Sequence, residues 1–468
     1  MSDPVPSEVK CPHCGTQSVT DANFCRACGT ALGKSEITTQ LLSEETLQLP
    51  SHGLATTPIQ QPLVTESVGP IDAKEVLNAM SVLQTLARKK LDEHGPLLAD
   101  YRFIFILHFL SDLLGFMEAF TLLGMRWELA QFLYKPYLYR YKERIAKQIE
   151  DHKAQVNPLT KASLETIIRN NIQASRDDNR KIVIVEDGGY IVPLVHRAFS
   201  SDVDRFQGAV EQTTKGINED LTVAPLKFPV LSVANARVKR EKESPQIAEA
   251  VWDNIRRLLS GSHRDLTNPK VLVVGYGSIG MSLADYLRRN CATVKVFDQD
   301  DNKRKEAANA GFTVDDSIKK LVEKEHGLIV IGATGKTSIG EQEILALEHD
   351  SLLVSASSDQ LEIGTRELRY LSVDPKGTLL TDVRSGEKVG DVFKISENRN
   401  DITLLAEGYP INFWNTESMR IRVSQVAMVP LFLSTIALIT QQANIGLGQP
   451  NSAMVDQLIE SEQIFDRL

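Results

Sequence analysis

Hydrophobic positions follow two alternating patterns over most of the chain. Between residues 76 and 91, valine, leucine and methionine recur at steps of three and four, which predicts a helix with one apolar face. Short, largely apolar runs predict strands at 102–107, 182–185, 228–233, 271–274, 293–297, 328–331 and 352–354, the first of them buried. Helical patterns lie between them at 111–124, at 281–290 and, as a charged and exposed helix, at 137–151. Strands that alternate with helices indicate parallel α/β sheets.

The pattern breaks near the amino terminus and so divides the chain. Residues 33–71 are polar, rich in proline, serine and threonine and without clear periodicity, which is typical of a flexible linker. We therefore expect a compact unit at 1–32, a linker at 33–71, a first α/β domain at 72–244, a second, doubly wound α/β domain at 245–400, and a C-terminal segment at 401–468. The apolar end of that segment is expected to return to the first domain or to pack against a second subunit.

Composition and charge are typical of a globular protein, and we expect it neither to span a membrane nor to bind nucleic acid. Of the 468 residues, 42% are hydrophobic and 24% are charged. The 52 basic and 61 acidic residues give a formal net charge of -9, so we expect no nucleic-acid partner. The apolar stretch at 103–125 contains charged residues, and the one at 426–439 is short and contains Pro430, so both are expected to be buried core. The first ten residues lack a signal pattern, and we expect a cytoplasmic protein.

Four of the five cysteines form two CxxC pairs, each followed by glycine: Cys11 with Cys14, and Cys25 with Cys28. Four thiolates complete a tetrahedral Zn²⁺ shell with no open position, so the spacing predicts a structural zinc ribbon. Disulfides fit less well in a large chain without a secretion signal. Because the chain is acidic, we expect the ribbon to contact a protein partner rather than nucleic acid.

A glycine-rich turn follows the predicted strand at 271–274. The run Gly275-Tyr-Gly277-Ser278-Ile279-Gly280 opens a helix, and Asp298 ends the next strand. Glycines at these positions permit a tight turn, close approach of the backbone to a pyrophosphate, and close helix packing. Asp298 can accept hydrogen bonds from a ribose diol and would repel a 2′-phosphate, which favours NAD over NADP. The sequence predicts a Rossmann-type NAD-binding domain, and a Rossmann-shaped domain with an empty pocket is the alternative.

From about residue 95 to 440, the order of motifs resembles S-adenosylhomocysteine hydrolase. The motifs are Glu186-Asp187-Gly188-Gly189, Glu211-Gln-Thr-Thr-Lys-Gly216, Val233–Lys239, the glycine-rich turn with Phe297-Asp298, Ala333-Thr-Gly335, and Leu404–Gly408 with Asn412. The resemblance implies bound NAD, oxidation of a ribose 3′-hydroxyl, elimination of homocysteine, addition of water and final reduction. It further implies a nucleoside-type ligand, a substrate-type first domain, and dimers or tetramers.

The resemblance carries over unevenly to single residues. On the cofactor side it matches Thr213, Thr214, Asp298, Thr334 and Asn412, beside the glycine-rich turn. On the catalytic side it places Asp187 at the substrate, Lys239 near the reacting hydroxyl, Glu243 in place of an aspartate partner, and His108 in an altered HxT motif. Four positions depart from the family: Leu110 replaces a threonine, Gln212 an acidic residue, Ser244 an asparagine and Ser358 a histidine. The C-terminal tail also departs from the family's pattern.

Each catalytic assignment has a structural alternative. Lys239 lies in the basic run Arg237–Lys242 and can be surface charge, His108 can be a core histidine, and Asp187 can be a turn residue. We therefore carry two main hypotheses: an NAD-binding relative degenerate in hydrolase activity, with a regulatory or scaffold role through the ribbon, and an active NAD-dependent hydrolase of adenosylhomocysteine or a related ribosyl substrate. An ordinary NAD dehydrogenase fits less well, because it leaves the DGG and LLAEG segments unexplained.

Overall fold

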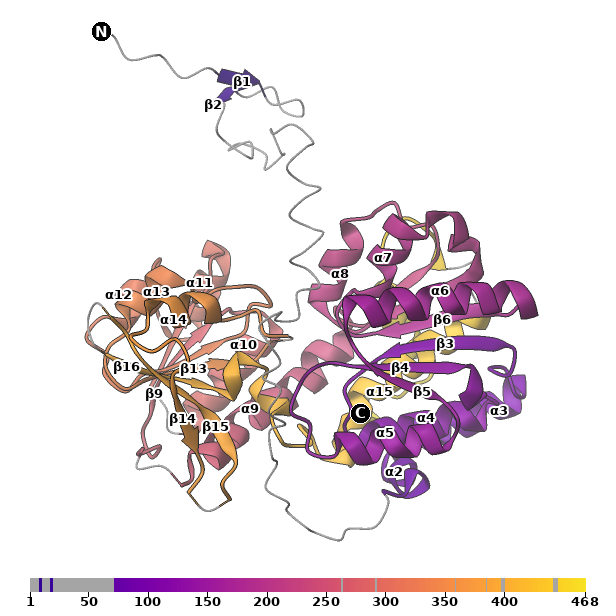
Figure 1. Cartoon of the computed structure of the whole chain (residues 1–468), viewed down its shortest axis with the longest axis horizontal. Coiled ribbons are helices and arrows are strands. Elements are labelled where there is room, and N and C mark those ends of the chain that lie inside the picture. Colours follow the sequence, from indigo (N-terminus) through magenta and orange to yellow (C-terminus); the bar gives the residue numbers. More distant parts are fainter. Residues whose placement is uncertain are drawn as a thin grey trace. The chain divides into compact units, whose positions relative to one another are not determined.

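A computed structural model describes residues 8–10, 17–19, 71–261, 264–290, 293–357, 359–383, 385–396, 400–440 and 445–468 (Figure 1). The chain divides into two units, residues 1–60 with 160–162 and the remainder, and each is treated by itself. In the first unit, β1 (Glu8–Lys10) pairs antiparallel with β2 (Gln17–Val19). The four predicted zinc ligands, the linker up to residue 70 and Ser358 lie outside the described residues.

The first α/β domain is built on a six-stranded parallel sheet in the order β5-β4-β3-β6-β7-β8. Its strands are β3 (Tyr101–Ile106), β4 (Ala130–Tyr134), β5 (Gln155–Pro158), β6 (Lys181–Glu186), β7 (Phe206–Glu211) and β8 (Val230–Ser232). Its helices are α2 (Ala73–Ala79), α3 (Ser81–His94), α4 (Asp112–Leu122), α5 (Lys142–Asp151), α6 (Lys161–Asp178), α7 (Ile191–Ala198) and α8 (Thr214–Leu221). The predicted strands at 102–107, 182–185 and 228–233 are confirmed, as is the helix at 111–124.

The sequence prediction missed several elements of this domain, among them β4, β5 and α6, and two of its departures have a clear structural reason. The helix expected from residue 137 begins only at Lys142, and the side chains of Tyr137 and Tyr139 before it are buried rather than exposed. Both tyrosines join the apolar core of the first sheet, so tertiary packing rather than the charged pattern decides this segment. Strand β7, which lies next to the edge strand β8, was not predicted, because Gly208 interrupts its apolar pattern. At Gly208 φ is +152°, and an added Cβ would lie 2.6 Å from the Pro229 carbonyl oxygen.

The second α/β domain has an eight-stranded sheet in the order β11-β10-β9-β12-β13-β16-β15-β14. The strands are β9 (Lys270–Val274), β10 (Thr293–Phe297), β11 (Thr313–Val314), β12 (Ile329–Gly332), β13 (Ser351–Ser355), β14 (Thr378–Thr381), β15 (Lys388–Lys394) and β16 (Asp401–Leu405). The helices are α9 (Ser244–Leu259), α10 (Ser278–Arg289), α11 (Asp301–Asn309), α12 (Ile318–Val322), α13 (Glu341–Ala346) and α14 (Thr365–Leu371). The sheet is parallel except at β15, which pairs antiparallel with both β14 and β16, and β16 extends the sheet past residue 400.

Both faces of this second sheet are covered, as a doubly wound fold requires. Val271 and Val273 of β9 belong to one apolar core, and Leu272 and Val274 belong to another on the opposite face. The strand order reverses between β9 and β12, which is the point where open α/β sheets bind ligands. The predicted α/β class with a Rossmann-type domain is therefore confirmed.

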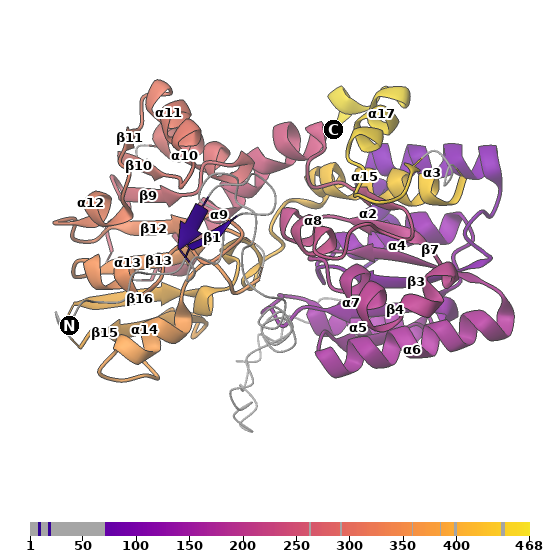
Figure 2. The same cartoon turned by 90° about the horizontal axis from the view of Figure 1, so that it is seen from above.

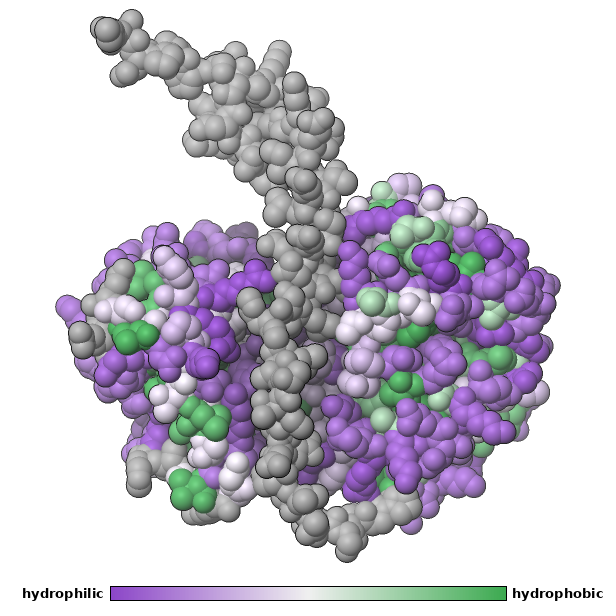
Figure 3. All heavy atoms as spheres, viewed as in Figure 1, coloured by the Kyte–Doolittle hydropathy of each residue, from purple (hydrophilic) through white to green (hydrophobic). Residues whose placement is uncertain are grey.

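The C-terminal segment returns to the first domain. Helix α15 (Ile421–Thr440) packs against α3, α4 and β7, and its apolar residues join the core of the first sheet (Figure 2). By length and composition α15 is the one candidate membrane span in the described chain, and 83% of its apolar window is buried inside the protein. Helix α17 (Ala453–Ser461) and a final turn at Phe465–Arg467 follow. Over the described residues, the face in Figure 3 is mainly hydrophilic with scattered hydrophobic patches.

Candidate functional site

A cavity of about 260 Å³ brings together most of the predicted site residues. The predicted residues that line it are His108, Asp187, Thr213, Thr214, Lys239, Glu243, Gly277, Ser278, Ile279, Thr334 and Asn412. Asp187 and Thr213 follow β6 and β7, and Gly277 and Thr334 follow β9 and β12. The cavity therefore lies at the carboxyl ends of strands from both sheets, where α/β proteins bind ligands.

A second cavity, of about 530 Å³, adjoins the first. Both are lined by Gly277, Ala333 and Thr334, and the second also contains Gly275 and Asp298. Two spaces that meet over the amino end of α10 match the two halves of a dinucleotide, with the pyrophosphate at the positive end of the helix.

The glycine-rich turn leaves room where a pyrophosphate would lie. Gly275 has φ +101°, and a Cβ on Gly280 would lie 1.8 Å from the Gly275 carbonyl oxygen, so α10 packs directly on the turn. A Cβ on Gly277 would meet nothing within 4 Å, which shows open space on the cavity side. No side chain of the described residues caps the first turn of α10, and its N–H groups remain available to an anion. These residues fit a dinucleotide.

Asp298 is positioned by its own neighbours at the end of β10. Its Oδ2 accepts a hydrogen bond from Tyr276 N at 2.7 Å, and its Oδ1 accepts one from Asp300 N at 2.8 Å. A carboxylate has about four lone-pair sites, so acceptor capacity remains for a ribose diol. The same negative charge disfavours a 2′-phosphate, in agreement with the predicted preference for NAD.

The turn after β12 is tied to the loop after β13 by one buried carboxylate that the sequence analysis missed. Glu362 has no exposed surface and accepts hydrogen bonds from Thr334 N at 3.0 Å, Thr334 Oγ1 at 2.7 Å and Gly335 N at 3.0 Å. It also accepts one from Ser357 Oγ at 2.6 Å. Glu362 thereby fixes Thr334 at the point where the two cavities meet.

Lys239 and Glu243 lie on a turn of π-helix (Lys239–Glu243) that leads directly into α9. Lys239 Nζ is 2.8 Å from Glu243 Oε1, and both side chains line the smaller cavity. Glu243 Oε2 is buried without a hydrogen-bond partner in the described part of the chain. Lys239 is paired and only 17% exposed, so simple surface charge does not describe it. A lysine side chain held by a carboxylate beside a cofactor cavity can give up a proton as the ammonium and take it back as the amine.

Asp187 is held as a buried anion in the turn after β6. It is 2% exposed, forms a close ion pair with Lys135, and its Oδ2 lies 3.4 Å from His108 Nε2. Burial alone would raise the pKa of Asp187, but Lys135 and His108 outweigh it and hold this pKa well below its usual range. The residue is therefore more than a turn-former, and its carboxylate already has a strong partner.

His108 belongs to the cavity wall rather than to the apolar core alone. Its ring stacks on Phe413 at 3.9 Å between centroids, and its Nδ1 lies 2.9 Å from the Tyr139 hydroxyl oxygen. Its Nε2 faces Asp187, as described above. Both ring nitrogens thus have polar partners, an arrangement that orients an imidazole for hydrogen bonding.

A buried charge cluster behind Asp187 was not predicted from the sequence. Lys135 follows β4, has no exposed side-chain surface, and lies 3.2 Å from Asp359 Oδ1 in addition to its contact with Asp187. Asp359 accepts hydrogen bonds from the hydroxyls of Tyr137 at 2.7 Å and Tyr190 at 2.6 Å. Lys215 Nζ lies 3.0 Å from the second oxygen of Asp359. The sequence feature that could have identified Lys135 as a site residue is its position at the carboxyl end of β4. Strand β4 was itself not predicted, so this feature was not recognised.

Three further carboxyl groups lie beneath the Asp187 turn. Glu211 accepts hydrogen bonds from Gly188 N at 3.1 Å and Gly189 N at 2.9 Å, and burial together with Glu186 raises its pKa to about 8. Glu186 accepts three backbone N–H bonds at the start of α7. Neither oxygen of Asp220 has a hydrogen-bond partner among the described residues, and burial with Glu186 and Glu211 raises its pKa to about 10. Asp220 is therefore protonated at neutral pH.

Three of the departures from the family pattern lie at or next to the same cavity. Gln212 and Ser244 line it, and Leu110 is buried in the wall of a small space that also contacts Gln212. The end of the chain packs on its own first domain, because the Arg237 guanidinium lies 4.1 Å and the Lys242 ammonium 4.9 Å from the Phe465 ring centroid. These contacts cover part of the basic run next to Lys239.

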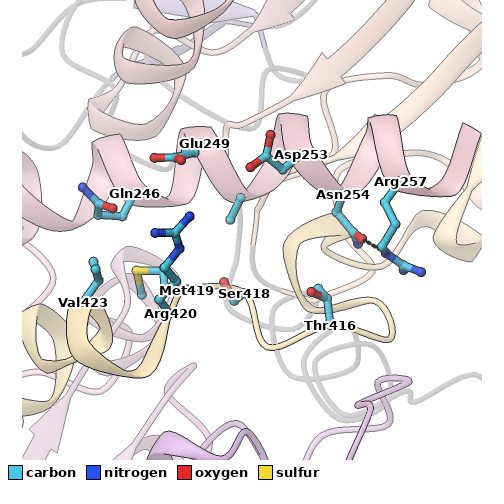
Figure 4. A pocket seen from close by; sticks show the side chains of 11 residues that line it. Gln246, Glu249, Asp253, Asn254, Arg257, Thr416, Ser418, Met419, Arg420 and Val423 are labelled. Atoms are coloured by element: carbon cyan, nitrogen blue, oxygen red, sulfur yellow. Dashed lines mark hydrogen bonds between the residues drawn. The ribbon is translucent and has the colours of Figure 1, made fainter. Parts of the chain in front are cut away.

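A third cavity, of about 310 Å³, lies between α9 and the segment that precedes α15 (Figure 4). Charged side chains line it, among them Glu249, Asp253, Arg257 and Arg420. Arg257 Nε donates to Asn254 Oδ1 at 2.6 Å, the bond drawn in Figure 4. No predicted site residue contributes to this cavity, and the chemistry points to the pair of cavities described above.

The fold and the site define a dinucleotide-binding protein with a Rossmann domain. Residues 7–32 match the zinc-ribbon domain model, and residues 271–318 match the TrkA-N domain model. The chain is 30% identical over 239 residues to an S-inosyl-L-homocysteine hydrolase of Methanopyrus kandleri (49% of this chain, 54% of the relative). It is 27% identical over 257 residues to an adenosylhomocysteinase of Thermotoga maritima (53% and 61%). An uncharacterised Mycobacterium tuberculosis protein is 26% identical over 282 residues (59% and 50%).

Over about half its length, this chain is similar in sequence to adenosylhomocysteinases and to S-inosyl-L-homocysteine hydrolases, and its N-terminus matches a zinc-ribbon model. It spans about half the length of the first curated relatives it matches. Among solved structures, it is similar to a dipicolinate synthase from Bacillus halodurans (11% identity, TM-score 0.40, 73% of this chain and 99% of that chain). It is also similar to a 2-hydroxyacid dehydrogenase from Ketogulonicigenium vulgare (14% identity, TM-score 0.40, 69% and 98%).

Proposed function

We propose that this chain is an NAD-binding, adenosylhomocysteinase-like protein whose hydrolase activity is lost or greatly reduced, and that it acts in regulation or as a scaffold through its zinc ribbon. The observation that carries the proposal is the pairing of Asp187. The carboxylate that the family places at the substrate is held by Lys135, and Asp359 completes the cluster. A carboxylate already paired in a buried site has little capacity left for a substrate proton.

The cofactor half supports the first part of the proposal. The N–H groups at the start of α10 would bind the pyrophosphate, Asp298 the adenosine ribose, and Thr334 the region between the two halves. Thr214 and Asn412 line the remaining half of the cavity. NAD, when bound, supplies a hydride acceptor.

An active hydrolase remains the second candidate, and the Lys239–Glu243 pair favours it. The 2.8 Å ion pair faces the cavity and is the arrangement that a 3′-hydroxyl would need for proton transfer. Glu243 is one methylene longer than the aspartate of the family, which displaces the reacting group, and small displacements reduce catalysis strongly.

Homocysteine release decides between the two candidates. The full chain, supplemented with NAD, is assayed with S-adenosylhomocysteine and S-inosylhomocysteine beside an authentic hydrolase, while bound NAD is measured separately. We expect NAD to bind and no homocysteine to appear. Steady turnover that disappears in Lys239→Ala would establish the enzyme instead, and failure to bind NAD would overturn both candidates.

The zinc ribbon, the assembly and the compartment complete the proposal. Cys11, Cys14, Cys25 and Cys28 would hold one structural Zn²⁺, which the zinc-ribbon match over residues 7–32 supports. A protein partner of the ribbon, a dimer or tetramer, and a place in the cytoplasm are parts of the same proposal. Analytical ultracentrifugation measures the assembly, and pull-down with the full chain against a Cys11→Ser, Cys14→Ser control measures the partner.

A further inference from the structure

One carboxylate of the second domain lies in a set of donors that all come from the first. Asp359 follows β13, whereas Lys135 follows β4, Tyr137 lies two residues later, Tyr190 precedes α7, and Lys215 is in α8. Both oxygens of Asp359 are used: Oδ1 by Lys135 and Tyr137, and Oδ2 by Tyr190 and Lys215. Two ammonium groups and two hydroxyls that converge on one carboxylate form a charge-assisted binding site for such a group.

Asp359 is held there at some cost to its backbone. Its φ is +63°, in the left-handed region that side chains other than glycine rarely occupy. Such a conformation persists when the surrounding contacts determine it, and the Asp359 N–H also donates to the Tyr137 hydroxyl oxygen at 2.8 Å. The side chain is 16% exposed, so solvent reaches the site.

The same loop binds the cofactor turn at its other end. Three residues after Asp359, Glu362 accepts the hydrogen bonds of Thr334 and Gly335 described above. The loop that carries Asp359 and Glu362 therefore links the cofactor turn of the second domain to the charge cluster of the first. The cavity depends on that link, since Thr213 and Thr214 form one wall and Gly277 and Thr334 form the other.

We infer that Lys135, Tyr137, Tyr190 and Lys215 form a carboxylate-binding site, and that Asp359 fills it as a built-in ligand that latches the two walls of the cofactor cavity together. The latch concerns NAD retention and so rests on the cofactor part of the proposed function. When the binding-competent state is only partly populated, the apparent dissociation constant rises by the inverse of its fraction. Loss of Asp359 leaves two buried ammonium groups short of a counter-charge, which opens the latch.

The test uses the full chain with Asp359→Ala, Asp359→Asn and the matched control Asp285→Ala. Asp285 is a surface aspartate of α10 that pairs with Arg288, so its loss removes the same charge away from the cavity. NAD affinity is measured by calorimetry in sodium acetate and in sodium chloride at equal ionic strength. Hydrogen exchange of the peptides that contain Tyr190 and Lys215 is followed in parallel without NAD.

We expect Asp359→Ala to weaken NAD binding by about tenfold or more and acetate to restore most of the affinity, because acetate replaces the missing side chain. Asp359→Asn should be equally weak and should not respond to acetate, since its amide still fills the space. Unchanged NAD affinity in Asp359→Ala, or a loss that acetate does not reverse, overturns the latch. If the wild type itself does not bind NAD, the proposed function fails, and hydrogen exchange without NAD then decides whether the latch exists. A latch predicts that the peptides containing Tyr190 and Lys215 exchange faster in Asp359→Ala and that acetate slows this exchange. Exchange that is the same in Asp359→Ala and in the wild type overturns the latch.

Discussion

The buried carboxyl of Asp220 makes the first domain lose stability as the pH rises. Burial near Glu186 and Glu211 raises the pKa of Asp220 from 3.8 to about 10, whereas an aspartate in an unfolded chain ionises near about 3.9. Between these values the folded chain holds a proton that the unfolded chain releases, so rising pH favours unfolding. The value pH 7 lies about 3 units above the pKa of the unfolded chain. At about 1.36 kcal/mol per unit, the protonated carboxyl therefore costs the folded state about 4 kcal/mol of stability at this pH.

Replacing Asp220 with asparagine removes the ionisation and with it the pH-dependent term. We expect Asp220→Asn to raise the free energy of unfolding of the first domain by about 4 kcal/mol at pH 7, by about 1 to 2 kcal/mol at pH 5 and by less than about 1 kcal/mol at pH 4. Urea titrations read by hydrogen exchange of the β6 and β7 peptides isolate this domain. Asp285→Asn, an exposed surface change, should show no such trend.

The growth of the difference between pH 5 and pH 7 is the decisive quantity. A stabilisation of the same size at both pH values would mean that Asp220 is ionised in the folded state or that asparagine acts only through new hydrogen bonds. A destabilisation at pH 7 would mean that the carboxylate has a partner that the described residues do not reveal. Either result would refute the electrostatic account of the Glu186, Glu211 and Asp220 cluster.

Three further predictions concern the cofactor and the ribbon. Gly277→Ala should leave the melting temperature nearly unchanged, because the added Cβ meets nothing within 4 Å. It should weaken NAD binding, measured by calorimetry, at least tenfold, because the methyl group enters the space of the pyrophosphate. An unchanged affinity would place the cofactor elsewhere. Asp298→Ser should reduce the NAD to NADP preference, measured as the ratio of dissociation constants, and an unchanged ratio would contradict its role at the ribose. Cys11→Ser with Cys14→Ser should release Zn²⁺, measured by elemental analysis, while the melting temperature of the α/β domains stays constant; their joint unfolding would contradict an independent ribbon.

The sequence predicted those parts of the site that depend on the backbone. The glycine spacing of the turn follows from steric demands, and a Cβ at 1.8 Å from the Gly275 carbonyl oxygen shows why position 280 is glycine. The strand at 271–274 was predicted because a strand buried on both faces is continuously apolar. The site assignments of Lys239 and Glu243 came from the resemblance, and the structure places them together on one turn of helix.

The charge cluster could not be predicted because its members come from distant segments. Lys215 and Asp359 stand among polar neighbours and look like surface charge in the sequence, and nothing local to Lys135 names its distant partners. Strand β7 and the segment at Tyr137 were misassigned for related reasons, since Gly208 breaks one pattern and a buried tyrosine pair interrupts the charged stretch of the other. Tertiary packing decides such positions, and a single sequence contains little trace of it.

The balance of charge around Asp187 argues that this half of the site was rebuilt rather than merely eroded. Random loss of catalytic groups would leave buried charges without partners, and each would strongly destabilise the fold. Here two lysines face two aspartates, Lys135 meeting both Asp187 and Asp359, and Lys215 meeting Asp359. Such a set is stable only as a whole, because removing one member leaves the remaining buried charges without a full counter-charge. The cavity therefore joins an open glycine-rich turn on the cofactor side to a carboxylate, Asp187, whose charge is already balanced by Lys135.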